Sequence, residues 1–489
     1  MEEIKNTMER KRWEKTAEVV FYILVFAAIS CFAMLQVYGD PPDEINRFKI
    51  VSYIWNYGYL PKGGDPEVIL AGYGASYAFQ PILTYIIQGY LLRFLGMFTK
   101  DGYVLLLAAR MVNVCFGVLM AYYVRCIAKE AWKNPYVQWT FTLLVVFLPQ
   151  NIFIHSYVNT DSMAMLSVAI IFYVLLRAMR TGYSRKDCVL LSIGIILCAM
   201  SYYNAYGIIV AAILVFIMNF VHRQEGKTKK VTIEWREMLR KGGLISAIVL
   251  LGIGWWFVRN AVLYDGDIIA MNARLQCAIE TATPDYNPLT RFTYQKEGIP
   301  LREMLFDTGY VTLLRDSFIA MFGPMAIPTH GLIYIFYKYL WIITCAAAVL
   351  PMKTWIDKGC SQEASPWKSE DVGDWKKKAV FYGGMLLFCF ITIGLSIYYS
   401  YTWEFQPQGR YILPVLVPFM YLVTLGIQKL CILAEHFRIT RAVKCARLLC
   451  IGIMSYVMLA FAYSLFDRFI PYYLQGENMF SMYGKIFIP

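Results

Sequence analysis

Charged side chains are scarce in this sequence of 489 residues: Asp, Glu, Lys and Arg make up only 16% of it. Soluble domains carry roughly 25%, and no polar stretch here is long enough to fold alone as a soluble domain. Hydrophobic residues make up 58% of the chain, and the mean hydropathy is +0.47. The composition excludes a soluble globular protein and predicts an all-α polytopic membrane protein.

Paired cysteine motifs are also absent. The twelve cysteines are scattered singly, and no CxxC motif occurs. Most lie within apolar runs, such as Cys31 and Cys389, and only Cys277 falls in a long polar loop. This spacing excludes a disulfide framework and a zinc site built from cysteines.

Eleven apolar segments are long enough, or nearly long enough, to cross the ~30 Å core of a bilayer. The predicted spans are residues 18–38, 103–124, 136–155, 161–178, 187–202, 204–221, 243–263, 331–351, 379–399, 411–430 and 447–467. The N-terminal segment is rich in Lys and Arg and precedes an apolar run without a small-residue cleavage site, which indicates a retained first span. The chain is therefore predicted to form one membrane domain, 1–489, with two substantial external loops, 39–102 and 265–330.

One further apolar stretch, Pro81 to Phe98, is long enough either to span or to lie flat. If it lies flat, most of the 46 Lys and Arg fall in six segments on the side of the N-terminus. If this stretch crossed the membrane instead, five of these six basic segments would lie outside, which would violate the positive-inside rule. We therefore predict that it lies flat, with the N-terminus cytoplasmic. Because the runs of Lys and Arg reflect the orientation of the chain in the membrane, the net charge of +12 does not indicate nucleic-acid binding.

Two adjacent carboxylates, Asp43 and Glu44, follow Pro41-Pro42 directly after the first span. Apolar residues at helical spacing come next, and they predict an amphipathic helix in the plane of the interface; they are Ile45, Phe48, Val51, Ile54 and Trp55. Both carboxylates would lie at the N-terminus of this helix, where its dipole favours their ionised form.

Other ionisable residues fall on the same predicted external face or within a span. They are Asp161, Arg259 and Arg410 at the ends of spans, and Arg110 inside the second span. Such residues cost ~2.5 to 3.5 kcal/mol at membrane depth, so they are functional candidates or structural ion pairs. The structural alternatives are a helix cap for Asp161 and arginines that reach toward lipid head groups. Tyrosines at 202, 203, 206, 398, 399 and 401 would line a sugar or lipid groove, or belong to an interfacial belt.

In their order and sidedness, these motifs resemble the GT-C superfamily of integral-membrane glycosyltransferases, which includes the protein O-mannosyltransferases and the lipid A aminoarabinose transferases. The resemblance extends over most of the chain. The motifs that carry it are Pro42-Asp43-Glu44, Gln80-Pro81, Ala109-Arg110, Asn159-Thr160-Asp161, Trp255 to Asn260, and Gln408-Gly409-Arg410-Tyr411.

The resemblance implies inverting transfer of a sugar from a polyprenyl phosphate on the extracytoplasmic face. Asp43 would then be the catalytic base, Glu44 would help to hold the acceptor, and Asp161 would orient the acceptor or a metal. Arg259 and Arg410 would neutralise charge on the departing phosphate.

Asn159, Gln80 and Arg110 would position the acceptor or the donor. Gln80 stands where some GT-C members carry an acidic or basic residue, and a Gln is a poorer metal ligand. We therefore expect no cofactor and no metal, although a divalent metal stays open. The expected partners are a polyprenyl-phosphate-linked sugar, an envelope glycan, lipid or protein acceptor, and membrane lipid, in a bacterial plasma membrane.

Two other functions remain open from the sequence. A lipid or glycan transporter or flippase would place its charges near the bilayer midplane and often shows internal repeats, of which none is visible. A ligase or polymerase that takes a glycan from a polyprenyl pyrophosphate would share the external arginines without requiring both Asp43 and Glu44.

Overall fold

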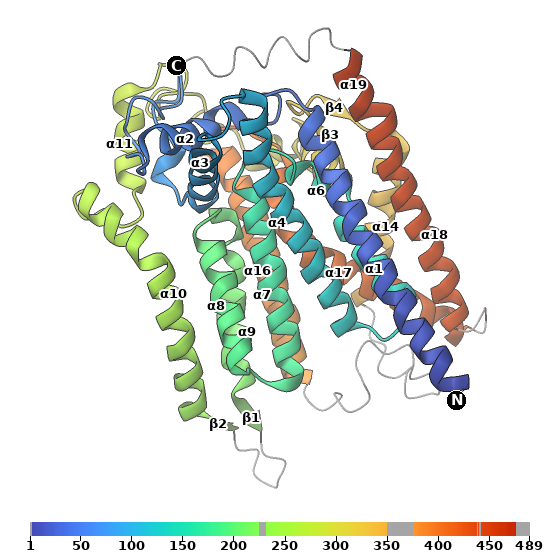
Figure 1. Cartoon of the computed structure of the whole chain (residues 1–489). Helices are drawn as coiled ribbons and strands as arrows, with labels where there is room; N and C mark the ends of the chain where they lie inside the picture. Colours follow the sequence, from blue (N-terminus) through green and yellow to red (C-terminus); the bar gives the residue numbers. More distant parts are fainter. Residues whose placement is uncertain (1, 224–230, 350–374, 438, 440–441, 476–489) are drawn as a thin grey trace.

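The computed structural model of the protein describes residues 2–223, 231–349, 375–437, 439 and 442–475 (Figure 1). Within these residues the chain is mostly helical, and its strands form two short antiparallel pairs. The predicted all-α membrane architecture is confirmed.

Eight helices in the described part of the chain are long and apolar enough to cross a bilayer. They are α1 (Glu2–Leu35), α4 (Gly102–Ala131), α7 (Asp161–Thr181), α10 (Trp235–Leu263), α14 (Gly331–Val349), α16 (Trp375–Thr402), η5 (Gly409–Val415) continued by α17 (Leu416–His436), and α18 (Ala442–Tyr463) continued by η6 (Ser464–Phe469) and α19 (Ile470–Gln475). These helices coincide with eight of the eleven predicted spans.

The other three predicted spans contain shorter helices: α5 (Pro135–Val146) with α6 (Pro149–Ile154), α8 (Arg185–Ala199), and α9 (Gly207–Asn219). The segment predicted as one span at 136–155 is split because Pro149 has no backbone N–H to donate and starts a new helix instead. At 1.5 Å per residue, α8 and α9 are only about 22 and 20 Å long. The total number of membrane crossings stays a prediction.

The remaining elements lie mostly at one end of the helix bundle. They are α2 (Glu44–Tyr57), η1 (Tyr77–Phe79), α3 (Leu83–Leu95), η2 (Tyr203–Ala205), α11 (Met271–Thr281), α12 (Leu301–Phe306), α13 (Tyr310–Ile319), and the paired strands β3 (Met321–Phe322) and β4 (Ile327–Pro328). The strands β1 (Val221–Arg223) and β2 (Val231–Ile233) lie at the opposite end (Figure 1). Helix α3, from the stretch predicted to lie flat, is about 20 Å long and too short to cross a ~30 Å core.

Burial of the long helices differs sharply. Helix α7 is apolar around its whole circumference and is 83% buried in its most apolar window, so it forms the centre of the bundle. The corresponding window of α10 is only 11% buried, and Leu251 on it is 83% exposed. Helix α10 stands apart at one edge of the molecule (Figure 1), where its apolar surface suits contact with lipid.

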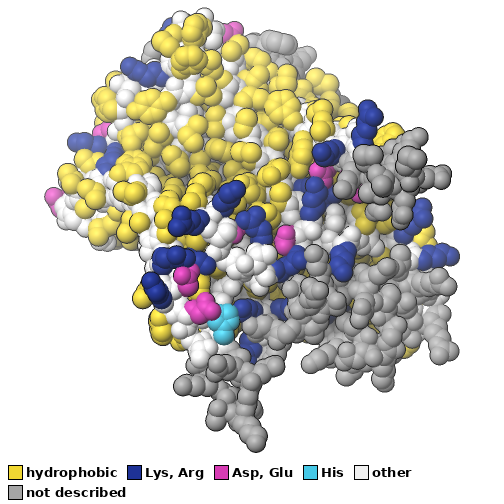
Figure 2. Space-filling model, turned by 60° about the horizontal axis from the view of Figure 1, so that its bottom comes forward, with side chains coloured by type: hydrophobic (Ala, Val, Ile, Leu, Met, Phe, Trp, Pro, Cys, Tyr) yellow, Lys and Arg dark blue, Asp and Glu magenta, His cyan; other side chains and the backbone are white. Residues whose placement is uncertain are grey.

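Basic side chains gather at the end of the bundle where α1 begins. Figure 2 shows Lys and Arg there, bordering a large apolar surface. The connections between α4 and α5 and between α7 and α8 both lie at this end (Figure 1). Helices α2, α3 and α11 lie at the other end.

Candidate active site

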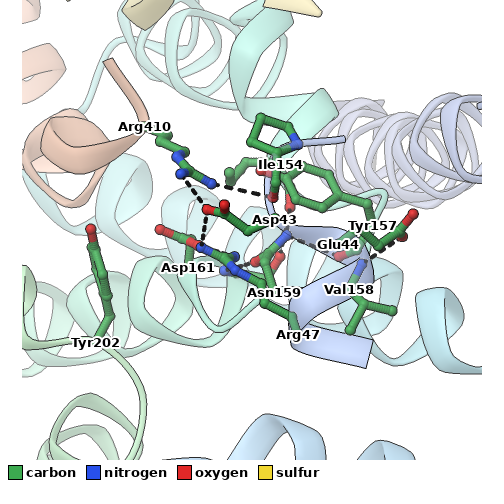
Figure 3. A network of polar contacts seen from close by, with 12 residues as sticks. Asp43, Glu44, Arg47, Ile154, Tyr157, Val158, Asn159, Asp161, Tyr202 and Arg410 are labelled. Atoms are coloured by element: carbon green, nitrogen blue, oxygen red, sulfur yellow. Dashed lines mark hydrogen bonds and ion pairs between the residues drawn. The ribbon is translucent and has the colours of Figure 1, made fainter. Parts of the chain in front are cut away.

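Asp43 lies between two arginines at the start of α2. Its backbone adopts φ 63°, an uncommon conformation for a residue other than glycine, and its side chain makes no capping hydrogen bond to the helix. The carboxylate is instead directed toward Arg410, whose Nη2 lies 2.5 Å from Oδ2, and toward Arg47, whose Nη2 lies 3.8 Å from the same oxygen. Figure 3 shows Asp43 between these two guanidinium groups. The cap position thus presents a carboxylate both to Arg47, one turn along α2, and to Arg410, which is distant in sequence.

Glu44 forms a buried two-point ion pair with Arg110. Arg110 donates from Nε to Oε1 at 2.8 Å and from Nη2 to Oε2 at 2.6 Å, and the backbone N–H of Val158 donates to Oε1 at 3.1 Å. The side chains are 0% and 1% exposed. Glu44 and Arg110 therefore hold the start of α2 in place. The roles predicted from the sequence, in holding the acceptor for Glu44 and in positioning for Arg110, stay predictions. The spacing of charged residues along a sequence does not show whether a side chain is buried in an ion pair or faces a catalytic site.

Asp161 and Asn159 order the start of α7. Asp161 accepts from Nη1 of Arg47 at 2.8 Å and is 1% exposed. Asn159 caps the helix by accepting from the backbone N–H of Ser162 at 2.9 Å, and its amide donates to the carbonyl of Ile154 at 2.7 Å. Arg410, Asp43, Arg47 and Asp161 thus form one alternating chain of charges (Figure 3). Asn159 thus orders the backbone before α7. Its predicted role in positioning the acceptor or the donor stays a prediction.

Arg410 is held by a close approach between two backbone segments. The hydroxyl of Ser317 on α13 accepts from the backbone N–H of Gly409 at 2.7 Å. A Cβ atom at Gly409 would lie 2.1 Å from the backbone nitrogen of Phe318, closer than any real contact. Only glycine fits, so α13 fixes the point at which Arg410 leaves the chain.

We expect Gly409→Ala to lower both stability and activity. Displacement of a tightly packed backbone costs about 1 to 3 kcal/mol, and the movement would shift Arg410 away from Asp43. The measurement is the melting temperature of the purified protein together with its transfer rate. Gly383→Ala on α16 is the matched control, because no atom lies within 4 Å of the added Cβ. Equal behaviour of the two variants would contradict the close approach.

The two arginines also set the ionisation of Asp43. Burial raises the pKa of its carboxyl, but the charges of Arg410 and Arg47 outweigh burial and lower the pKa from 3.8 to about 2. The carboxylate is therefore ionised throughout the physiological range. Its ion pairs stabilise the fold fully above pH 3.8 and lose that contribution as the pH falls toward 2.

Removal of Arg410 should move this acid transition upward. Arg410→Gln removes one of the two positive charges that offset the effect of burial on Asp43, so the pKa of Asp43 rises. The stability contributed by the ionised carboxylate is then lost at a higher pH. Melting temperatures of the wild type and Arg410→Gln between about pH 2 and pH 8 measure the effect. Arg302→Gln, an exposed change on α12, is the control. Acid transitions at the same pH in all three proteins would show that Arg410 does not tune Asp43.

A cavity of about 650 Å³ lies beside Asp43. Its charged lining residues are Asp43, Arg47, Arg274, Arg291, Glu404 and Arg410. Its tyrosines are Tyr73, Tyr77, Tyr85, Tyr202, Tyr203, Tyr206, Tyr286, Tyr398, Tyr399 and Tyr411, and Gln80 also contributes. The tyrosines at 202, 203 and 206 come from the connection between the short helices α8 and α9, which lies below α2 and α3 in Figure 1. The cavity is thus rich in hydroxyl groups and aromatic faces.

The two loops predicted to be external are joined at the cavity. The backbone N–H of Thr283 donates to the carbonyl of Gly72 at 2.9 Å, and the hydroxyl of Thr281 donates to that of Gly74 at 2.5 Å. Gly74 has φ 69°, and a Cβ there would lie 2.3 Å from the backbone nitrogen of Ala282. Segment 269–291 therefore forms a wall of the cavity together with the first loop.

Arg259 is not among the residues that line this cavity. Its Nη2 donates to the carbonyl of Pro61 at 2.6 Å, and its guanidinium lies 5.2 Å from the ring centre of Trp256. In this conformation it supports the first loop, and it is separate from the Asp43–Arg410 pair. The role in phosphate binding predicted for Arg259 stays a prediction.

Four charged lining residues were missed by the sequence prediction. Arg47 carried a usable signal, because it lies four residues after Asp43 on the predicted helix, the spacing at which opposite charges pair. Glu404 lies in the external segment that precedes Arg410. Arg274 and Arg291 lie in a long loop, where no periodicity shows which side chains face inward.

A metal site built from acidic, cysteine or histidine ligands is not found in the described part of the chain, where no three such residues come together. Gln80 lines the cavity, but the nearby carboxylate of Asp43 is already bound by arginines. The absence of a metal requirement remains a prediction.

Comparisons with known proteins give distant structural matches. No curated protein matches the sequence. The chain is similar to the archaeal oligosaccharyltransferase AglB from Archaeoglobus fulgidus, solved with an inhibitory peptide and a dolichol-phosphate, at 12% identity and a TM-score of 0.45. The match covers 91% of this chain and 56% of that one, so the chain spans only about half the length of AglB.

A second similar structure is ArnT from Cupriavidus metallidurans bound to undecaprenyl phosphate, at 11% identity and a TM-score of 0.38, covering 85% of this chain and 78% of that chain. With TM-scores below 0.5, these matches do not define the chemistry of this site. The family match is more direct, since the model described as "Predicted membrane protein (DUF2142)" aligns with residues 72–419. The chain belongs to this DUF2142 family of membrane proteins.

Proposed function

We propose that the protein is an inverting glycosyltransferase that moves a sugar from a polyprenyl-phosphate carrier to an acceptor on the extracytoplasmic face. One observation carries the proposal: the ionised carboxylate of Asp43 and the guanidinium of Arg410 lie 2.5 Å apart at the wall of one cavity. A base and a phosphate-binding cation are thus available to the same reacting centre. The tyrosines around them offer aromatic faces and hydroxyl groups suited to a sugar.

The transfer would proceed as a single displacement. The acceptor hydroxyl attacks the anomeric carbon while its proton passes to Asp43, and the bond from that carbon to the phosphate oxygen breaks with its electron pair. The carrier leaves as polyprenyl phosphate, and attack from the opposite face inverts the anomeric configuration. Arg410 stabilises the charge that develops on the leaving phosphate.

Arg410 would also couple donor binding to the strength of the base. A carboxylate with a pKa of about 2 is a weak base. When a donor phosphate binds Arg410, the negative phosphate offsets the positive charge that lowers the pKa of Asp43. The carboxylate then becomes more basic when the donor is in place.

The distribution of charge supports the proposed side of the membrane. Lys and Arg gather at the end of the bundle where α1 begins (Figure 2), and such segments are typically cytoplasmic. The Asp43 network lies with α2 at the other end (Figure 1). A transporter would instead keep ionisable groups along a path near the midplane, so this arrangement favours the transferase.

Mass spectrometry of released polyprenyl phosphate tests the proposal. Purified wild-type protein and Asp43→Asn are incubated in detergent with a panel of polyprenyl-phosphate sugars and an envelope extract as acceptor source. Release by the wild type alone, dependent on the extract, is the expected result. If both folded proteins release nothing from any donor but the wild type consumes polyprenyl-pyrophosphate glycans, the ligase or polymerase reaction replaces the proposal.

A further inference from the structure

Two arginines on the loop wall of the cavity are not used by the reaction described above. Arg274 on α11 and Arg291 in the segment after it both line the cavity. The guanidinium of Arg291 lies 3.6 Å from the ring centre of Trp403, and Arg291 is only 8% exposed. Its Nε is buried without a hydrogen-bond partner in the described part of the chain.

The positive charges of Arg274 and Arg291 are only partly balanced by negative groups nearby. Glu404, an acidic residue that lines the same cavity, accepts a hydrogen bond from the hydroxyl of Tyr73 at 2.9 Å. In the part of the chain that the structure describes, neither Arg274 nor Arg291 forms an ion pair within 4 Å. Burial is the main cause that lowers the pKa of Arg291, and the repulsion from Arg274 acts in the same direction, while Tyr399 and Glu404 act against them. Two cations held together near one carboxylate leave a positive site for an anion.

The surrounding rings suit a sugar as well as a charge. The rings of Tyr73 and Tyr286 lie 4.3 Å apart between their centres, and both line the same cavity. Because the guanidinium carbon of Arg291 lies over the ring of Trp403, the N–H groups at the edge of the guanidinium remain available for hydrogen bonds in its plane. This combination of aromatic faces and a preoriented guanidinium is suited to a saccharide that carries a carboxylate or phosphate.

We propose that Arg274 and Arg291, with Trp403, form an anion subsite that binds an acidic saccharide, separate from the Asp43–Arg410 pair. The inference rests on the proposed function for the identity of the ligand as a sugar. The acidic sugar belongs to the acceptor or to the group being transferred, and the carrier phosphate is bound at Arg410. Such a subsite would select acidic over neutral saccharides.

The test is a binding measurement on the full-length protein in detergent, without turnover. Dissociation constants are measured by calorimetry for glucose, glucuronic acid, glucose 6-phosphate, undecaprenyl phosphate and undecaprenyl diphosphate. The wild type is expected to bind at least one of the two acidic sugars tenfold or more tightly than glucose. Arg274→Gln and Arg291→Gln should each abolish this preference and leave undecaprenyl phosphate binding unchanged.

Control variants distinguish loss of the acidic-sugar subsite from loss of transfer and from unfolding. Arg302→Gln, an exposed change in the same loop, should behave as the wild type, and Asp43→Asn should keep the preference for acidic sugars even when transfer is lost. Melting temperatures check that each variant is folded. Equal affinity of the wild type for glucose and both acidic sugars would overturn the subsite. Loss of undecaprenyl diphosphate binding alone in Arg274→Gln and Arg291→Gln would assign the pair to a pyrophosphate carrier and also overturn it.

Discussion

Replacement of Asp43 by Asn is expected to lower kcat/KM for sugar transfer by about 10²- to 10⁴-fold, the contribution that a positioned general base makes to a rate. Asn has nearly the same size and still accepts a hydrogen bond from Arg410, but it cannot take the acceptor's proton. The loss should appear mainly in kcat, because the proton moves only as the reaction proceeds. Initial rates of polyprenyl phosphate release measure it.

The control for this variant is Glu67→Gln, which neutralises an exposed carboxylate of the same loop. That change should leave the rate within about twofold, since surface substitutions away from a site have small effects. Asp43→Asn must also elute as a single species and keep a cooperative melting transition. A folded Asp43→Asn protein with a rate close to that of the wild type would remove Asp43 from the mechanism.

The second large effect is expected in stability. Glu44→Leu removes the carboxylate that pairs with Arg110 in a buried site, and loss of one partner of such a pair costs about 3 to 5 kcal/mol. The reverse variant, Arg110→Leu, strands Glu44 in the same way. Unfolding by denaturant in detergent, followed by tryptophan fluorescence, would give both values.

The double variant, Glu44→Leu with Arg110→Leu, separates pairing from packing. It removes both charges together, so it should be more stable than the sum of the two single effects predicts. It still loses the bonds from Arg110 to the carbonyls of Ala33 and Gln36, each 2.8 Å long, and should not regain wild-type stability. Single variants with the stability of the wild type would show that the pair does not hold α2.

Apolar periodicity was sufficient to predict the helices, and the basic runs separated the short α3 from the spans. The pairing of Asp43 with Arg410 was also accessible, because both fall on the same predicted face. The sequence could not separate Glu44 from Asp43, because adjacent carboxylates at a helix start point in different directions. Both meet buried arginines, but only Asp43 lines the cavity. Arg291 was missed for another reason, since its stacking on Trp403 joins two irregular segments without a shared repeat.

The three ion pairs of α2 also define an order of assembly during synthesis. Glu44 has its partner 66 residues ahead, Arg47 has one 114 residues ahead, and Asp43 waits for one 367 residues ahead. Since a chain is made from its N-terminus, the anchor of the first loop is complete while most of the protein is still unmade. The carboxylate of Asp43 meets Arg410 last, when the segment before α17 arrives. A chain interrupted before that point carries an anchored first loop in which Asp43 has Arg47 but not Arg410 as a partner, so the proposed reaction requires insertion to have nearly finished.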